Sequence, residues 1–424
     1  MARSLAPVRA RFPGLAREVD GRPAVFADAP GGTQVPRSVI DAVAAYLERS
    51  NANQGGAFAT SEETDRLIQE ARRAGADLVG ADPGEVVFGP NMTTLAFGLS
   101  RALARILGPG EEVVVTLLDH DANIAPWVAA ARDSGATVRW VDVRESDTTL
   151  DLDTLDAALS PRTRIVAFTL ASNALGTITP AAEVVRRARQ TGAVLIGDAV
   201  HLAPHRRIDV RELGLDVLFC SAYKVFGPHL GMMWARHEHL ERWPAYKVRP
   251  APDTAPERWE TGTGNHEALA GLVAAVEYLA EVGRECAGAP ADDRSAAVTA
   301  AMGAIREHEA RLTRRFLDGA SRLPGLRLFG IGDPDRADER TPTFALRLGD
   351  LSPRRVAEEL GRRGVFVWDG NYYALAIMER LELVERGGAV RVGFCHYNTE
   401  AEVDRVLDEL ADLASTWPAG RGGG

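Results

Sequence analysis

The stretch GDAVHLAPHRRIDVRELGLDVLFCSAYKVFGP, residues 197–228, decides the fold predicted for this chain. One apolar run ends just before Asp198, and a second run, 216–220, is followed by Ser221 and then by Lys224. Short apolar runs bounded by turn residues are typical of buried parallel strands. Because ligands bind at the carboxyl ends of strands in open α/β sheets, we expect Asp198 and Lys224 to face one crevice.

A carboxylate and a lysine in one crevice suit pyridoxal phosphate (PLP). The lysine can form a Schiff base with the cofactor's aldehyde, and the carboxylate can keep the ring nitrogen protonated, so that the ring accepts electrons. For either residue alone, an ordinary acid or base at a strand end is the simpler interpretation. Other motifs along the chain favour a cofactor site formed by Asp198 and Lys224 together.

Length and composition narrow the class of protein. A chain of 424 residues predicts two domains, and a net charge of -10 argues against nucleic acid as the main partner. No apolar run is long enough for a membrane span, and the Arg-rich N-terminus lacks the apolar segment of a secretory signal. Three widely spaced cysteines fit a reducing compartment. We therefore expect a cytoplasmic protein without a membrane or nucleic-acid partner.

The order of the predicted elements suggests the domain organisation. From residue 85 to residue 235, short apolar runs alternate with helical patterns, which predicts βα units and a parallel sheet. A break of small residues at 288–293 marks the approach to a domain boundary. The expected division is an N-terminal segment (1–25) that packs with the small domain, a large PLP-binding domain (26–290) and a small α+β domain (291–424).

Residues 89–94, GPNMTT, stand at a predicted turn from a strand into a helix over 95–107. Thr93 and Thr94 would present hydroxyl groups and backbone amides at the helix N-terminus, which is an arrangement that binds anions. The alternative, that the two threonines only cap the helix, is equally compatible with this stretch.

Eight segments, in order along nearly the whole chain, resemble fold-type I PLP enzymes, specifically the cysteine desulfurase-like branch of the class V aminotransferase family. They are FADAPGG (26–32), GPNMTT (89–94), LDHDANIAPW (118–127), ASNALGTITP (171–180), GDAVHLAPH (197–205), CSAYKVFGP (220–228), WETGTGNH (259–266) and VRVGFCHYNT (390–399). The resemblance implies an α/β fold with a mostly parallel seven-stranded sheet in the large domain. It also implies bound PLP, an amino-acid substrate and a homodimer with a shared active site.

The resemblance further implies roles for individual residues. Lys224 would be the Schiff-base lysine, Asp198 the partner of the ring nitrogen, and His120 the residue over the ring face. The other cofactor ligands would be Asn173 and His201 at the phenolic oxygen, Thr93, Thr94, Ser221 and Tyr223 at the phosphate, and Thr263 at the phosphate bound by the neighbouring subunit. Arg391 would take the substrate carboxylate, a task suited to a guanidinium fork. Lys224, His120 and Arg391 are thus the expected catalytic residues.

The chain departs from cysteine desulfurases at the loop that carries their nucleophilic cysteine. The corresponding stretch here, VFVWDGNYYALAIMERL (365–381), begins with a predicted strand over 365–368. It contains no cysteine, and Tyr373 stands in its place. Without a thiolate, the loop has no acceptor for the substrate sulfur. Cys395 follows Arg391 by four residues and is expected on the same strand face over 390–395. A buried structural thiol is the simpler interpretation for Cys395.

A second departure concerns the cleft. The segment NANQGG (51–56) contains Asn53, a candidate substrate-binding residue, and has Gly55 and Gly56 where desulfurases tend to have bulkier basic residues. The missing side chains leave room for a substrate larger than cysteine. The aromatic residues of the loop, Trp368, Tyr372 and Tyr373, are candidates to line this space.

The expected function is that of a PLP-dependent lyase that acts on an amino acid, through β-elimination at the carbon–sulfur bond of a cysteine conjugate. An aminotransferase, an epimerase or a decarboxylating variant uses the same carbanion and is the alternative. A desulfurase that uses Cys395 comes third, and a catalytically silent partner protein is disfavoured by the intact Lys224 and Asp198.

His201 and His205 have the spacing of a metal pair, but Pro204 lies between them and no third ligand is evident. We expect no metal.

Overall fold

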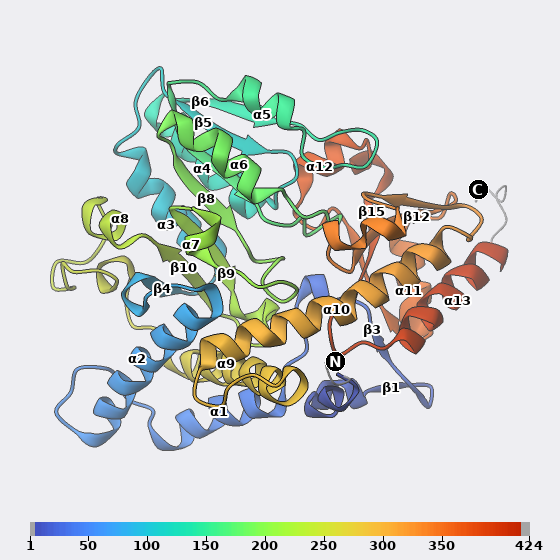
Figure 1. Ribbon diagram of the computed structural model, residues 1–424, viewed down its shortest axis with the longest axis horizontal. Coiled ribbons are helices and arrows are strands. Elements are labelled where there is room, and N and C mark those ends of the chain that lie inside the picture. Colours follow the sequence, from blue (N-terminus) through green and yellow to red (C-terminus); the bar gives the residue numbers. More distant parts are fainter. Residues whose placement is uncertain (1–4, 417–424) are drawn as a thin grey trace.

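A seven-stranded sheet forms the centre of the computed structural model, which describes residues 5–416 (Figure 1). Its strand order is β4-β10-β9-β8-β7-β5-β6. β10 runs antiparallel to both neighbours, and the other six strands run parallel to one another. The predicted mostly parallel sheet is therefore confirmed. Its strands are β4 (Val86–Gly89), β5 (Glu112–Thr116), β6 (Thr137–Val141), β7 (Thr163–Thr169), β8 (Val194–Asp198), β9 (Val217–Ser221) and β10 (Gly231–Ala235).

Helices cover both faces of this sheet. Val113 and Val115 of β5 pack in one apolar cluster with Trp127, whereas Val114 packs in another with Leu272. Successive strand residues point to opposite faces, so a strand buried on both sides is apolar throughout. The helices are α1 (Arg37–Arg49), α2 (Ala59–Val79), α3 (Met92–Ala104), α4 (Ala125–Ser134), α5 (Leu152–Ala158), α6 (Ala181–Ala188), α7 (Val210–Leu213), α8 (His237–Arg242) and α9 (His266–Ala287).

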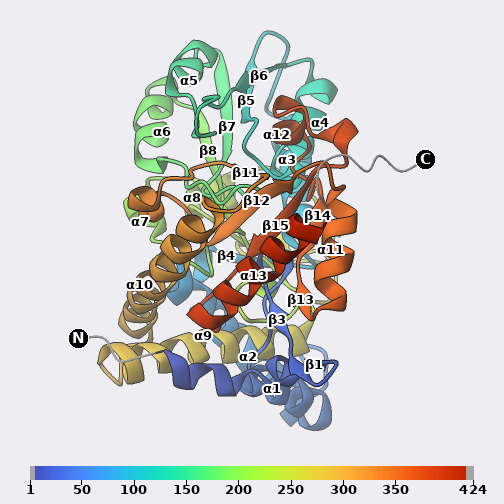
Figure 2. The same cartoon turned by 90° about the vertical axis from the view of Figure 1, so that its right-hand side faces the viewer.

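A second, antiparallel sheet of four strands lies beside the first in Figure 1 and faces the viewer in Figure 2. Its strands, in spatial order, are β11 (Leu326–Phe329), β12 (Thr343–Leu348), β15 (Ala389–Gly393) and β14 (Trp368–Gly370). Its helical layer consists of α10 (Arg294–Ala320), α11 (Pro353–Arg362) and α13 (Glu400–Thr416), while α12 (Leu375–Arg380) follows β14. Phe344 and Val392 pack against the helical layer. Arg391, between Val390 and Val392, therefore points away from the helices and towards the large sheet.

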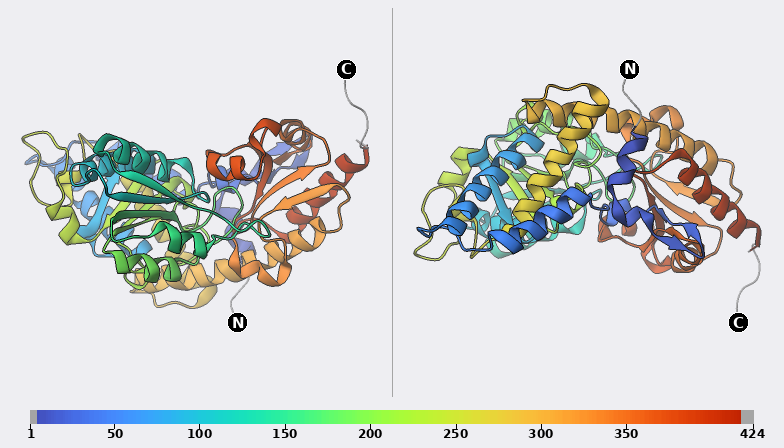
Figure 3. Two further views of the ribbon diagram at one scale, coloured as in Figure 1. Left: turned by 90° about the horizontal axis from the view of Figure 1, so that it is seen from above. Right: turned by 90° about the horizontal axis from the view of Figure 1, so that it is seen from below.

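The described part of the N-terminal segment, residues 5–25, lies at the junction of the two sheets (Figure 3). Phe12 packs edge-on against Tyr278 of α9, with ring centroids 5.4 Å apart, and also contacts Tyr397 at 5.0 Å. β3 (Val25–Phe26) pairs in parallel with β13 (Val365–Phe366), and β1 (Glu18–Val19) forms a hairpin with β2 (Arg22–Pro23). The segment thus contacts both parts of the chain. α9 and α10 are separated at 288–293, and the boundary at residue 290 stays a prediction.

Three element boundaries differ from those expected. α3 begins at Met92 rather than at residue 95, because the Asn91 side chain caps it by accepting the Thr94 N–H at 2.8 Å. The single strand expected over 365–368 is two strands, β13 and β14, which belong to different sheets. β15 ends at Gly393, so the strand expected to reach Cys395 is shorter. Within residues 5–416, no helix has the length and apolar character needed to cross a membrane.

Arg72 of α2 ties together segments that are distant in sequence. Its guanidinium donates to the Val86 carbonyl at 2.6 Å and to both carboxylate oxygens of Glu260 at 3.0 Å. Glu260 also accepts the Phe88 N–H at 2.8 Å. The buried arginine therefore anchors the segment that leads to Thr263 onto β4.

We expect Arg72→Met to lower the free energy of unfolding by about 3 kcal/mol, because it leaves the half-buried Glu260 carboxylate without its cation and the buried Val86 carbonyl without its donor. Arg73→Met is the matched control, since the exposed Arg73 pairs with Glu70 alone among the residues that the structure describes, and its loss should cost less than about 1 kcal/mol. Urea unfolding followed by circular dichroism measures both. Equal effects of the two substitutions would contradict an anchoring role for Arg72.

Candidate active site

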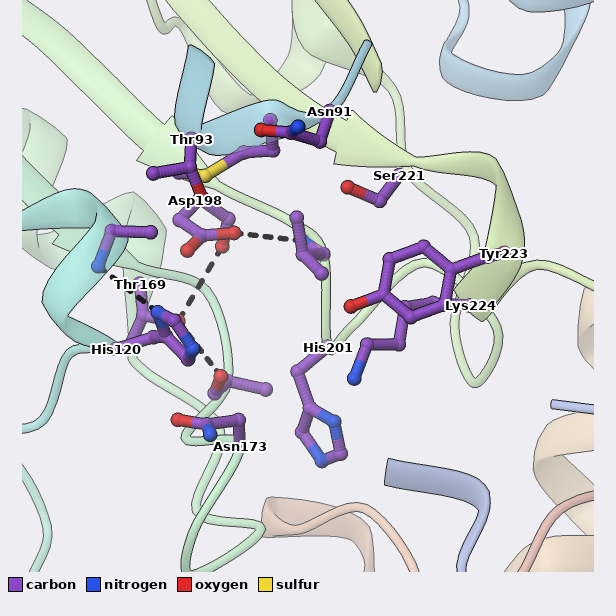
Figure 4. Close-up of a pocket in the computed structure, with 14 residues that line it drawn as sticks. Asn91, Thr93, His120, Thr169, Asn173, Asp198, His201, Ser221, Tyr223 and Lys224 are labelled. Atoms are coloured by element: carbon purple, nitrogen blue, oxygen red, sulfur yellow. Dashed lines mark hydrogen bonds between the residues drawn. The ribbon is translucent and has the colours of Figure 1, made fainter. Parts of the chain in front are cut away.

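A cavity of about 90 Å³ opens at the carboxyl ends of the parallel strands (Figure 4). The chain reaches it immediately after β4, β5, β7, β8 and β9, so residues far apart in sequence converge there. The predicted site residues that line it are Thr93, His120, Asn173, Asp198, His201, Ser221, Tyr223 and Lys224. Eight of the expected residues therefore share one cavity.

Lys224 and Asp198 are the two charged residues among those that line this cavity. Lys224 follows β9, and its Nζ donates to the Pro30 carbonyl. Burial, helped by the nearby positive charge of Arg391, lowers the pKa of Lys224 to about 7. Asp198 ends β8, where burial raises its pKa to about 6 although its Oδ1 accepts the Val200 N–H at 2.8 Å. A large fraction of the Lys224 amine is consequently neutral near pH 7.

His120 precedes the short helical turn Asp121–Asn123. Its Nδ1 accepts the Ala122 N–H at 3.0 Å, so the neutral imidazole carries its proton on Nε2. Burial and the nearby positive charges of Lys224 and Arg391 lower the pKa of His120 to about 4. The Tyr373 ring stacks on the imidazole, with centroids 5.7 Å apart and planes 23° apart. His120 is therefore a neutral hydrogen-bond donor at physiological pH.

Asn173 and His201 also line the cavity (Figure 4). The Asn173 amide donates to the Tyr372 carbonyl at 2.9 Å, and its Oδ1 is buried without a partner. His201 Nε2 lies 3.1 Å from Thr341 Oγ1, and burial lowers its pKa well below the usual range. An unpartnered buried acceptor beside a cavity is a position that a bound group can satisfy.

Arg391 adjoins the cavity without being among its lining residues. It is buried, donates to the Asn173 carbonyl at 2.9 Å, and stacks its guanidinium 4.4 Å from the centroid of the Tyr372 ring. Its Nε is buried without a partner. Burial lowers the pKa of Arg391 to about 10, so the side chain stays charged at neutral pH. A charged fork with an unused donor is suited to a carboxylate.

Three predicted site residues lie elsewhere in the single chain. Asn53, Thr94 and Thr263 line a second cavity of about 700 Å³. Thr94 Oγ1 is occupied by Asn91 Oδ1 at 3.0 Å, and Thr263 is exposed. Thr94 and Asn53 are thus not brought together with Lys224, in contrast to Thr93. Thr263 was expected to act in a neighbouring subunit, which a single chain does not test.

The expectation that Cys395 shares a strand face with Arg391 is wrong, because β15 ends at Gly393 before the chain turns. The Cys395 backbone N–H donates to Asn398 Oδ1 at 2.9 Å, and the buried thiol does not line the Lys224 cavity. Burial raises the pKa of Cys395 well above the usual range and that of Cys220 to about 12. Protonated, buried thiols are poor nucleophiles.

No role was assigned from the sequence to Pro30 or Thr341, which contact Lys224 and His201. Pro30 lies in the matching segment FADAPGG (26–32), whereas no local sequence pattern marks Thr341, which is distant in sequence from His201. Within residues 5–416, His205 belongs to no group of three or more potential metal-ligand side chains, and its Nδ1 lies 3.0 Å from Glu309 Oε2.

Comparison with known proteins agrees with this geometry. Residues 25–300 and 294–406 match the family described as Aminotransferase class-V. The chain belongs to the class V aminotransferase family. A probable cysteine desulfurase from Streptomyces coelicolor is 32% identical over 427 residues, which cover 95% of each chain. A cysteine desulfurase from an Enterobacter species is 32% identical over 424 residues, covering 95% of this chain and 96% of the relative.

Solved structures of cysteine desulfurases share the fold of this class V aminotransferase family member. The apo cysteine desulfurase from Thermococcus onnurineus superposes with a TM-score of 0.83 at 24% identity, covering 96% of this chain and 99% of the other. The expected fold type I is confirmed, as is the resemblance to the cysteine desulfurase-like branch. The protein is therefore a PLP-dependent enzyme that acts on a small amino-acid substrate.

Proposed function

We propose that this enzyme is a lyase that breaks the carbon–sulfur bond of a cysteine conjugate by β-elimination. The observation that carries the proposal is the composition of the Lys224 cavity, which contains an amine and a carboxylate but no thiol. The reaction converts the conjugate and water into a free thiol, pyruvate and ammonia. Sulfur leaves directly as a thiolate, so no cysteine of the protein is needed.

The groups around the cavity fit PLP. Lys224 offers a partly neutral amine to the aldehyde, and Asp198 offers a buried carboxylate to the ring nitrogen. Asn173 and His201 offer an amide and an imidazole to the phenolic oxygen. Ser221 and the start of α3 offer a hydroxyl and backbone amides to the phosphate. Bound PLP would supply an electron-accepting ring that stabilises negative charge at the substrate Cα.

The side chains divide the remaining work. Arg391 binds and orients the substrate carboxylate through its unused donor edge. The Lys224 amine, once free and neutral, takes the proton from Cα. The pKa of His120 is about 4, so its imidazole is neutral at pH 7 and carries its single proton on Nε2. His120 therefore donates a hydrogen bond from Nε2–H to the departing sulfur. An aminotransferase, an epimerase or a decarboxylating enzyme would use the same residues to bind the substrate and form the carbanion. The products of the reaction distinguish these enzymes from a lyase.

We expect a variant in which Cys220, Cys286 and Cys395 are all changed to Ala to keep most of its turnover. Alanine avoids burying a new hydroxyl at these buried positions. Mass spectrometry of the thiol and pyruvate formed from a cysteine conjugate measures the reaction, and circular dichroism verifies folding. If Cys395→Ser alone stops turnover in a folded, PLP-loaded protein, the elimination mechanism is wrong and a persulfide cysteine replaces it.

We also propose that the active unit is a homodimer in the cytoplasm. The 700 Å³ cavity is bordered by the exposed Thr263 and by the exposed hydrophobic side chains of Tyr246 and Val248, which a second copy of the chain could cover. The odd number and wide spacing of the cysteines support the location. Light scattering should give twice the mass of the chain, and Val248→Asp should shift it towards the monomer with loss of activity. A fully active monomer would contradict a shared site.

A further inference from the structure

Trp368 lies on the same face of the small sheet as Arg391. The two residues are direct partners in the antiparallel pairing of β14 with β15, and such partners project to the same side. The indole rests on Gly31, since a Cβ at that glycine would lie 2.1 Å from Trp368 Nε1. Pro30, next to Gly31, accepts the hydrogen bond from Lys224. Trp368 therefore lies between Arg391, the proposed carboxylate site, and the turn at Pro30 and Gly31 that contacts Lys224.

Two further aromatic rings follow on the same loop and contact site residues. Tyr372 stacks on Arg391, and Tyr373 stacks on His120. Both tyrosines have left-handed backbone conformations, with φ of 55° and 56°, which are strained for residues with side chains. Hydrogen bonds hold them, because the Tyr372 carbonyl accepts from the Asn173 amide at 2.9 Å and the Tyr373 carbonyl accepts from the Asp121 N–H at 2.7 Å. The loop is thus anchored at the site.

The anchored loop leaves much of its apolar surface exposed. Trp368 is 49% exposed and Tyr373 is 74% exposed, and Leu375 on the same segment is exposed as well. Ligand sites bury such aromatic surface against an apolar part of the ligand. The acidic groups nearby, Asp28 beside Arg391 and Asp121 beside His120, disfavour a second carboxylate on the substrate.

We propose that Trp368 and Tyr373 bind an aromatic group carried by the sulfur of the substrate, so that the preferred conjugates are S-arylalkyl or S-aryl cysteines. The proposal rests on the proposed function in one respect, namely that Arg391 holds the carboxylate of an amino acid. With the carboxylate there, an aromatic sulfur substituent would extend along the two exposed rings. Neither ring belongs to the residues that line the Lys224 cavity, so this is a specificity surface beside the reaction centre.

The test is a binding titration of the PLP-loaded enzyme, in which the change of the cofactor's visible absorbance reports binding of S-benzyl-cysteine and S-methyl-cysteine. The wild type is expected to bind S-benzyl-cysteine about tenfold or more tightly than S-methyl-cysteine. Trp368→Ala should remove most of this preference, and Trp368→Phe should keep part of it. Gly31→Ala retains the tryptophan but displaces its indole, and should also reduce the preference.

Trp140→Ala is the matched control, because Trp140 is 45% exposed and lies on β6 at the edge of the large sheet. It should leave the preference intact. Equal affinities of the wild type for the two ligands, or equal losses in Trp368→Ala and Trp140→Ala, would overturn the aromatic surface and leave the lyase proposal standing. A preference that depends on Trp368 without release of the thiol would support the surface and overturn the lyase.

Discussion

Lys224→Ala is expected to lack both turnover and the visible absorbance band of the lysine-bound cofactor. Lys224 is the amine that faces Asp198 in the cavity, and the chain has only one other lysine, Lys247. Lys247 is a natural control, since its Nζ pairs with the exposed Asp253 at 3.0 Å. Lys247→Ala should keep the band and the activity. Borohydride reduction followed by peptide mapping should find the cofactor on Lys224, and an adduct on Lys247 would contradict the assignment.

The pH dependence of cofactor uptake tests the same residue without turnover. The pKa of Lys224 is lowered to about 7 from the usual value of 10.5, so the reactive neutral amine accumulates between about pH 6 and 8. The rate at which the cofactor-free protein gains the visible band should therefore rise through pH 7. A rise only above pH 9 would show that the lysine is not desolvated.

The lowered pKa of Lys224 also affects stability. Between about pH 7 and 10.5, Lys224 is protonated in the unfolded chain and mostly neutral in the folded chain. The free energy of unfolding should therefore rise with pH over this range.

The local parts of the site were predictable from the sequence, because a buried strand and the residue that ends it are adjacent in the chain. Asp198 and Lys224 follow apolar runs, and the parallel sheet brings such ends together. Thr93 lines the Lys224 cavity, whereas the pattern missed the Asn91 cap that moves the start of α3 and occupies Thr94.

What remained unpredicted depends on pairing between distant segments. The run 365–368 reads as one strand, and only the tertiary fold divides it between two sheets, which sets Trp368 opposite Arg391. Likewise, a strand pattern up to Cys395 gives no sign that β15 stops at Gly393, where the backbone leaves the sheet. One or two residues of register decide which side chains face the site.

Arg391→Ala is expected to lower kcat/KM for a cysteine conjugate by an amount equivalent to about 2–5 kcal/mol, the range for truncating one partner of a buried charged pair. The reason is geometric, because Arg391 has a buried, unpartnered Nε and is fixed by the Asn173 carbonyl and the Tyr372 ring. Arg391→Lys should recover part of the loss, since it restores the charge but not the two-pronged fork.

Two controls separate carboxylate binding from general damage to the small sheet. Arg347→Ala removes another buried arginine of that sheet, which within residues 5–416 donates to the Arg386 and Gly388 carbonyls alone. It should not change kcat/KM in a folded protein. The affinity for S-benzyl-cysteamine, which lacks the carboxylate, should differ little between wild type and Arg391→Ala. If Arg391→Ala weakens binding of this amine as much as that of S-benzyl-cysteine, Arg391 holds the fold of the site and a different residue receives the carboxylate.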